Sequence, residues 1–328
     1  MMAVLDFFAI AGTVTVNDDG EDVITDYNID FFTLRLLDVT KLAGILGDSL
    51  SYQSYVVDRT AETGTVYGTD LSDELLLGED VTEAYALGGD DVIDIQNGTA
   101  VVDGGEGINR LQALYTPDEI LLGNEDGSLT NYANIVDLVT NGNSKAAGNN
   151  EDNYIDARQM EADPSSGYSS VNGLGGNDAI FGGDIDNNMD GGLGNDYLFG
   201  RKGNDFLYGN LDNDKLFGGS GIDTLTGGSG VDKFVLGTID DGTDTVTDFD
   251  GRDVILVQIN SPLTEEPTDL GELLTALGLT LSSGIDHTNN GTLDTAIMQG
   301  QTTLMILENV AALNTDDVYD AYFEIEVI

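Results

Sequence analysis

The stretch Gly191-Gly-Leu-Gly-Asn-Asp-Tyr-Leu-Phe199 is one of seven nine-residue blocks that run without a gap from Gly173 to Val235. In each block an Asp, or once an Asn, is followed two residues later by one apolar side chain, as Asp196 is followed by Leu198. A single block is too short to bury that side chain, so successive blocks must stack and share a core. The acidic or amide positions of the blocks are Asp178, Asn187, Asp196, Asp205, Asp214, Asp223 and Asp232.

The composition of these blocks suits a bound cation. Glycines let the backbone turn through positive φ and approach a ligand closely, so the turn can aim carbonyl oxygens inward. The Asp adds a carboxylate, and hard oxygen ligands of this kind suit Ca²⁺. A glycine-rich solenoid without metal is the alternative interpretation, but it would leave closely spaced like charges uncompensated.

The block resembles the glycine-rich nonapeptide of the RTX calcium-binding repeat family. The resemblance implies an all-β fold, a parallel β-roll with two blocks in each turn and capping β-rich regions at both ends. It also implies calcium ions between loops that are two blocks apart in the sequence. Seven blocks, less the two without a downstream partner, give about five ions, and the site with Asn187 should be weaker because it lacks one charge. The implied pairs are Asp178 with Asp196, Asn187 with Asp205, Asp196 with Asp214, Asp205 with Asp223, and Asp214 with Asp232.

A fainter array lies upstream. Its candidate ligands, one in each of three copies, are again 18 residues apart, which is the length of two blocks. Each candidate is followed two positions later by an apolar residue: Leu75, Ile93 or Leu111. The stretch Gly148-Asn-Asn-Glu-Asp-Asn-Tyr-Ile155 is a further degenerate copy. We therefore expect degenerate roll turns over residues 66–160 and regular turns over 161–240, with an ordinary β-region as the alternative for the first range. The upstream metal ligands predicted in this way are Asp73, Asp91 and Asn109.

Residues 241–328 are expected to form a C-terminal cap. The segment Asp244-Thr-Val-Thr-Asp-Phe-Asp-Gly-Arg-Asp-Val-Ile-Leu256 resembles the part that closes such rolls. A short helix should begin after Asp269 and end at Gly278, with its leucines on one face. The last residues, Asp320–Ile328, resemble the C-terminal signal of type I secretion, and they would equally suit a final β-strand.

Residues 1–65 are the least informative part, and we expect either an N-terminal cap or an assembly region. The runs 10–16 and 22–29 favour short strands, and 38–47 favours a helix. The start of the chain has no basic segment and carries Asp6, so it does not resemble a Sec signal peptide. No apolar run approaches the ~18 residues that a transmembrane helix needs.

The charge of the chain excludes some partners. With 60 acidic and 11 basic residues, the formal net charge is -49, which argues against binding to nucleic acid. Without metal such a chain should repel itself and stay expanded. Halophilic adaptation is a second possible source of the acidity. The chain has no Cys, which is compatible with a secreted protein that depends on metal instead of disulfides.

The residues that catalysis needs are sparse. There is one His, His287 in a polar loop, and no Gly-x-Ser-x-Gly or phosphate-binding Gly-Lys-Ser/Thr motif. We therefore expect a non-enzymatic protein, and the resemblance to the RTX family implies an extracellular or cell-surface protein that leaves the cell by type I secretion. The leading hypothesis is a calcium-binding subunit of a surface layer, extracellular filament or matrix that self-associates. The alternatives are a binding module, such as an adhesin or a carbohydrate- or ice-binding protein for which cell-surface polysaccharide is a possible partner, and an accessory module of an enzyme.

Overall fold

The computed structural model describes residues 9–11, 14–16, 22–24, 28–30, 55–59, 64–78, 80–95, 101–113, 119–122, 132–141, 144–259, 269–313 and 323–327. The chain divides into two compact units, Met1–Gln53 and Ser54–Ile328. In the first unit, β1 (Ala9–Ala11) pairs with β4 (Asn28–Asp30) and β2 (Val14–Val16) pairs with β3 (Asp22–Ile24), both antiparallel. These strands overlap the two predicted runs, whereas the helix predicted over 38–47 lies outside the described residues.

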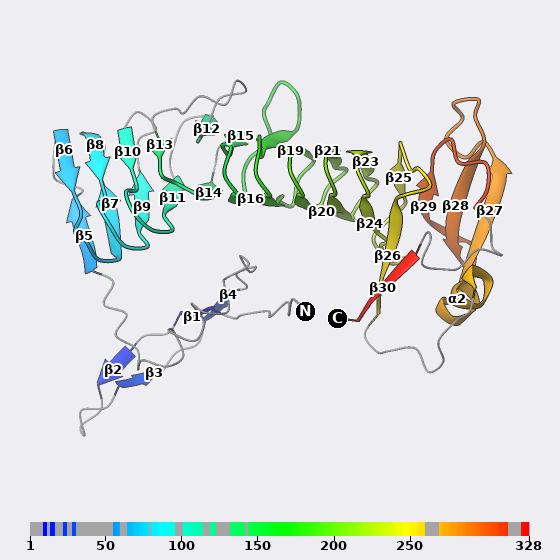
Figure 1. Cartoon of the computed structure of the whole chain (residues 1–328), viewed down its shortest axis with the longest axis horizontal. Helices are drawn as coiled ribbons and strands as arrows, with labels where there is room; N and C mark the ends of the chain where they lie inside the picture. The colour runs from blue at the N-terminus through cyan, green and yellow to red at the C-terminus, as the bar shows by residue number, and fades with distance from the viewer. Residues whose placement is uncertain are drawn as a thin grey trace. The chain divides into compact units, whose positions relative to one another are not determined.

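The second unit is nearly all β, and its parallel strands stack as a solenoid of about nine turns (Figure 1), which confirms the predicted fold class. One sheet of twelve strands runs through the whole solenoid, and the strands that precede the regular blocks belong to it. Its members are β5 (Tyr55–Arg59), β7 (Asp73–Leu77), β9 (Val92–Ile95), β11 (Arg110–Ala113), β14 (Asp137–Asn141), β16 (Tyr154–Gln159), β18 (Ala179–Phe181), β20 (Tyr197–Lys202), β22 (Lys215–Ser220), β24 (Lys233–Val235), β26 (Val254–Ile259) and β30 (Phe323–Val327).

Two shorter sheets form the opposite wall. The first has four strands: β6 (Gly64–Tyr67), β8 (Val81–Tyr85), β10 (Val101–Asp103) and β13 (Tyr132–Ala133). The second has ten: β12 (Glu119–Leu121), β15 (Lys145–Ala147), β17 (Ser169–Asn172), β19 (Asn187–Leu193), β21 (Phe206–Leu211), β23 (Thr224–Ser229), β25 (Asp244–Val246), β27 (Leu279–Ile285), β28 (Asp294–Gln299) and β29 (Thr302–Leu307).

A continuous column of apolar side chains runs along the inside of the twelve-stranded sheet. Successive strands pair so that each inward residue lies beside the next, as Ile180 lies beside Leu198 and Leu198 beside Leu216. Because side chains alternate between the two faces of a strand, one inward residue in each short strand suffices to continue the core. The column consists of side chains that are 0% exposed: Leu75, Ile93, Leu111, Leu138, Ile155, Ile180, Leu198, Leu216, Phe234, Ile255 and Phe323.

The C-terminal cap covers the last turns. Strands β27, β28 and β29 form an antiparallel group that continues the wall from β25. The predicted helix is confirmed as α2 (Leu270–Leu277), with Asp269 accepting a hydrogen bond from the backbone N–H of Glu272 and Gly278 in the left-handed region at φ 69°. The chain ends in β30, which pairs with β26 in parallel, so the strand expected at the end is present.

Candidate metal centre

The predicted ligands of the regular blocks form two ladders, one at each edge of the roll. In all five predicted pairs, the backbone N–H of the upstream residue donates to Oδ1 of the Asp one turn later. The N···O distances are 2.8 Å in four pairs and 2.9 Å from Asp214 to Asp232. The structure therefore brings together the residues of every pair that the two-block spacing implied.

The second carboxylate oxygen of these residues is left without a hydrogen bond. Within the regular blocks, Oδ2 is buried and unpartnered in Asp178, Asp196, Asp205, Asp214 and Asp223, and upstream the same holds for Asp91. A buried carboxylate oxygen without a partner is costly, so its surroundings call for a proton or a cation. Burial is the largest cause that raises the pKa of Asp178, Asp196 and Asp205 to about 8, and that of Asp214 to about 7.

A glycine keeps the space beside each of these oxygens open. A Cβ on Gly200 would overlap Oδ2 of Asp205 and lie 2.6 Å from the carbonyl oxygen of Gly218, one turn later. The same holds around Gly209, where the added atom would overlap Oδ2 of Asp214. The first glycine of each block is thus required for space, since any larger residue would fill the pocket between the carboxylate and the carbonyl.

This donor set fits Ca²⁺, which takes carboxylate and backbone carbonyl oxygens together. Within the described residues, no three Asp, Glu, His or Cys side chains converge on one point, so carboxylates alone do not make up the site. The residues that would hold calcium are Asp178, Asp196, Asp205, Asp214 and Asp223, together with carbonyls of the facing glycine turns. Bound calcium would supply positive charge to oxygens that are otherwise buried without a partner.

Both ladders continue beyond the blocks, where the two-block rule stopped too early. The N–H of Asp223 donates to Oδ1 of Asp244 at 3.2 Å, and the N–H of Asp232 donates to Oδ1 of Asp253 at 3.0 Å, each across 21 residues. The two last blocks therefore do have downstream partners. The sequence held a signal for both, because Asp244 and Asp253 also stand two residues before a buried apolar side chain.

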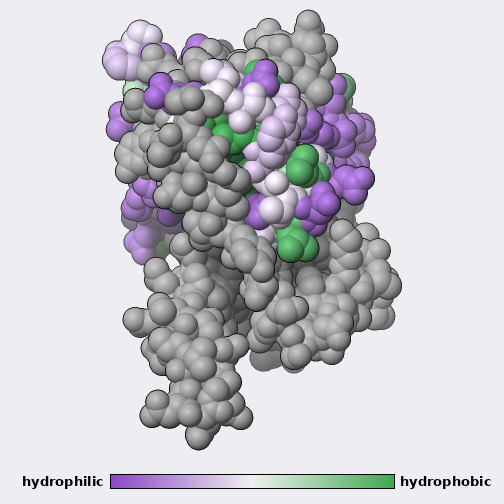
Figure 2. Space-filling model, turned by 90° about the vertical axis from the view of Figure 1, so that its left-hand side faces the viewer, coloured by the Kyte–Doolittle hydropathy of each residue, from purple (hydrophilic) through white to green (hydrophobic). Residues whose placement is uncertain are grey.

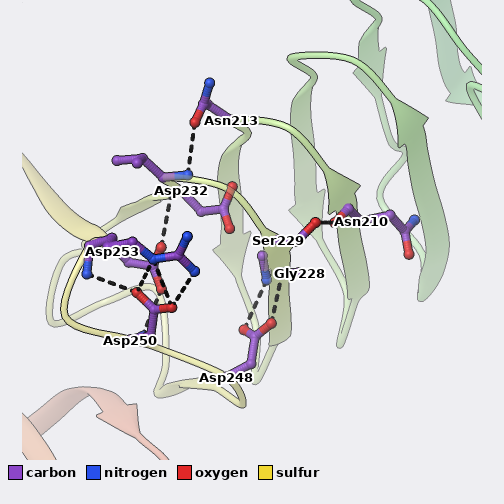
Figure 3. A network of polar contacts seen from close by, with 11 residues as sticks. Asn210, Asn213, Gly228, Ser229, Asp232, Asp248, Asp250 and Asp253 are labelled. Carbon is purple, nitrogen blue, oxygen red and sulfur yellow. Dashed lines mark hydrogen bonds and ion pairs between the residues drawn. The ribbon is translucent and has the colours of Figure 1, made fainter.

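Figure 3 shows how the last block is closed. Oδ2 of Asp253 accepts a hydrogen bond from the N–H of Asp250, whose carboxylate also binds Arg252. The carboxylate of Asp248 accepts hydrogen bonds from the backbone N–H groups of Gly227 and Gly228, at N···O distances of 3.0 and 2.7 Å. The ladder thus ends in residues that are hydrogen-bonded to one another and to the backbone.

The upstream end of the regular ladder also differs from the prediction. The N–H of Asn153 donates to Oδ1 of Asp178 at 2.7 Å across 25 residues, so Asp178 is not the first rung. The amide of Asn153 donates in turn to the carbonyl of Val136 at 3.3 Å, where the ladder has no carboxylate. Asn187 begins the second ladder, and its amide nitrogen donates to Oγ of Ser169 at 2.7 Å.

The upstream candidates share the ladder, but of the three only Asp91 has a buried Oδ2 without a partner, as the regular blocks have. Asp73 and Asp91 donate their N–H groups to Oδ1 of Asp91 and Asn109, at 2.7 and 3.0 Å. The amide nitrogen of Asn109, however, donates to the carbonyl of Asn134 at 3.1 Å. In this orientation Asn109 offers the pocket a donor, which does not support it as a metal ligand.

A third ladder uses amides and is independent of metal. The side-chain oxygen of Asn177 accepts the N–H of Asn195 at 2.9 Å, and that of Asn195 accepts the N–H of Asn213 at 3.0 Å. These bonds point from the later turn to the earlier one, whereas those of the Asp ladder point the other way. The residues of this amide ladder immediately precede Asp178, Asp196 and Asp214 in the sequence. Together the amide ladder and that Asp ladder fix the register of adjacent turns in both directions.

Comparison with known families agrees with this geometry. The family model of the RTX calcium-binding nonapeptide repeat (4 copies) matches residues 172–207, 181–216 and 208–238. No curated protein matches the chain. The chain therefore carries RTX calcium-binding nonapeptide repeats over the stretch that contains the open oxygen pockets. Repeats of this kind imply a calcium-binding, secreted protein.

Proposed function

We propose that this protein is a secreted, non-enzymatic structural protein whose calcium-dependent roll is the building unit of a surface layer, extracellular filament or matrix. The observation that carries the proposal is the two rows of buried, unpartnered carboxylate oxygens: Asp178, Asp196 and Asp214 beside the twelve-stranded sheet, and Asp205 and Asp223 beside the ten-stranded sheet. Calcium neutralises these rows, so folding of the roll is linked to extracellular calcium. Type I secretion delivers the chain to that calcium.

The charge of the chain supports assembly in calcium. A subunit with net charge -49 repels its neighbours over about a Debye length, ~8 Å at physiological salt. Each bound calcium cancels two of these charges as it folds the roll, which lowers the barrier to docking.

The first described turns also offer apolar surface for a contact. Tyr67 and Leu71 are each 56% exposed, and Leu87 is 43% exposed. On the face shown in Figure 2, hydrophobic residues lie among hydrophilic ones at this end of the roll. Repetition of an open end contact gives a filament or sheet.

Other features support a role without catalysis. The single histidine, His287, interacts with residues close to it in the sequence. Its backbone N–H donates to Oδ2 of Asp294 at 2.8 Å, and its ring nitrogen Nε2 lies 3.3 Å from the carbonyl oxygen of Ser282. A separate finding, unrelated to catalysis, is that no helix in the described part of the chain has the length and apolar character needed to cross a membrane.

Electron microscopy and light scattering of the purified full chain test the proposal across a calcium series at fixed ionic strength. Ordered arrays should appear with calcium and should not appear with the same concentration of Mg²⁺, which adapts poorly to a many-oxygen site. A chain that folds with calcium but stays monomeric at millimolar calcium contradicts the structural role.

A binding module is the second candidate, and stacked aromatic rings favour it. The rings of Phe199 and Phe217 are 4.8 Å apart and 11° from parallel, on adjacent strands, and both side chains are half-buried. Flat aromatic pairs of this kind can stack on sugar rings. Titration of the calcium-loaded chain with cell-wall polysaccharide separates the two candidates, since only the binding module responds to the glycan while still monomeric.

A further inference from the structure

Turn 73–90, upstream of the regular blocks, buries more apolar side chains than turn 196–213 in the regular array. Turn 73–90 buries five: Leu75, Leu77, Val81, Ala84 and Ala86. Turn 196–213 buries two, Leu198 and Leu207. Each Leu or Val that is fully buried contributes about 1.5–3 kcal/mol, so the upstream turn has a source of stability that the regular turn lacks.

In the upstream turns, the space beside the ladder side chains differs from that in the regular blocks, and Oδ1 of Asp73 and Oδ2 of Asp91 are their buried oxygens without a partner. Oδ2 of Asp73 accepts the backbone N–H of Thr69 at 2.6 Å. The amide of Asn109 donates into the corresponding pocket of its own turn, as described above. Asp91 has a buried Oδ2 without a partner, but Ala86 stands five residues before it, where the regular blocks have the space-making glycine.

In the described residues, the second edge of the upstream turns has no carboxylate ladder. Strands β8 and β10 place Val81, Ala84 and Val102 in the core. Turns 73–90 and 91–108 therefore bury one ladder carboxylate each, Asp73 and Asp91, whereas turn 196–213 buries two, Asp196 and Asp205. Because fewer carboxylates are buried in these upstream turns, stacking them without a metal ion costs less electrostatic free energy than stacking the regular turns.

Two asparagine side chains, Asn149 and Asn153, lie between the upstream turns and the regular turns. Asn149 donates its side-chain N–H to the carbonyl of Ile135 at 3.1 Å, and Asn153 donates to the carbonyl of Val136. These bonds satisfy the carbonyls of the last upstream turn without a cation. Beyond them, the next rung is Asp178, the first of the carboxylates with an unpartnered Oδ2 in the regular array.

We propose that the turns between residues 64 and 160 fold without calcium and act as a preformed base on which the calcium-dependent turns stack. The inference rests on the proposed calcium-dependent folding of the regular blocks. The base presents the edge of β16 to β18 in the register that the whole sheet follows. Calcium then adds turns to an existing template, which removes the need to nucleate the roll in each newly exported chain.

Hydrogen exchange with mass spectrometry on the full chain tests this inference, with chelator in one sample and excess calcium in the other. In chelator, peptides that contain 92–95 and 110–113 should exchange at least about 100-fold more slowly than peptides that contain 197–202 and 215–220. In calcium, both sets should be protected.

The outcomes distinguish the inference from the proposed function. If both sets exchange freely in chelator and both become protected in calcium, the preformed base is wrong and calcium-dependent folding stands. If calcium does not change the exchange of 197–220, both fail.

A pair of matched variants sharpens the test at single pockets. Ala86→Gly opens the space beside Asp91 and should increase the calcium bound by the full chain by about one ion, whereas Gly200→Ala should remove at least one. Unchanged binding in Ala86→Gly, in a chain whose 110–113 peptides stay protected, contradicts the assignment of Ala86 as the group that closes this pocket.

Discussion

Turns 73–90 and 196–213 each contribute one strand, β7 and β20, to the twelve-stranded sheet and have the same ladder hydrogen bond at its edge, yet different interactions stabilise them. The first buries five apolar side chains around one ladder carboxylate, and the second buries two around two carboxylates. Apolar burial and cation binding are thus alternative ways to hold one backbone arrangement. The ladder spacing alone does not reveal which of them a given turn uses.

The largest expected effect on stability comes from removing a core leucine, and it should differ between the upstream turns and the regular turns. Leu75→Ala should destabilise the chain by about 2–5 kcal/mol in chelator as well as in calcium, because the base is folded in both. Leu207→Ala should leave the transition in chelator unchanged and lower only the stability gained with calcium. Thermal unfolding followed by circular dichroism in both conditions measures the difference. Equal behaviour of the two variants in chelator would count against the comparison.

A smaller effect should come from the glycine that opens a regular pocket. Gly200→Ala should cost about 1–3 kcal/mol in calcium, because the new methyl group overlaps Oδ2 of Asp205. Gly251→Ala is the control: its Cβ would meet no atom within 4 Å, so its effect should stay within about 0.5 kcal/mol. Chemical unfolding in calcium compares the two, and similar losses would show that any glycine substitution is harmful.

The pH should modulate the calcium-free folding of the regular turns. Burial raises the pKa of Asp178, Asp196 and Asp205 from 3.8 to about 8 and that of Asp214 to about 7, so the calcium-free folded roll holds protons that the unfolded chain releases. Proton uptake therefore stabilises the calcium-free roll. This stabilisation is fully present below pH 3.8 and is lost as the pH rises through 7 to 8.

In chelator at about pH 8 the regular turns are expected to be unfolded with ionised carboxyls, and lowering the pH should restore part of their β-structure without calcium, because the buried carboxyls take up protons on folding. Circular dichroism in chelator across a pH series, at constant ionic strength, checks this expectation: the β-signal should increase as the pH falls below about 7. A calcium-free chain whose β-signal does not change with pH would mean that protonation of the buried carboxyls does not stabilise the regular turns.

The smallest effect is expected at the C-terminal strand. Nζ of Lys215 lies 3.1 Å from Oε2 of Glu326 and 5.5 Å from the centre of the Tyr197 ring. Because the ion pair is partly exposed, Lys215→Gln should cost only about 0.2–1 kcal/mol. A double-mutant cycle with Glu326→Gln isolates the pair, and a coupling well above that range would assign β30 a larger role in closing the roll.

The blocks predicted the fold and much of the site because both depend on local spacing. The Asp positions and the inward apolar residue follow directly from the repeat, and the structure brings all five implied pairs together. The rungs at Asp244 and Asp253 were missed because insertions lengthen the turns to 21 residues.

The filling of the upstream pockets could not have been predicted from the spacing. The N–H of Thr69 at Asp73 and the orientation of the Asn109 amide are set by the three-dimensional path of turns with irregular length. Ala86 is the exception, since its place in the block was readable from the sequence.

The most direct test of the account is to count the calcium ions bound to the full chain while its folding is followed. Equilibrium dialysis with radiolabelled calcium, with circular dichroism on the same samples, should find about five or more ions for each chain and a gain of β-structure over the same concentration range. Binding of fewer than about one ion, or a regular roll that is fully formed in chelator, would contradict the claim that calcium occupies the buried oxygen pockets and folds these turns.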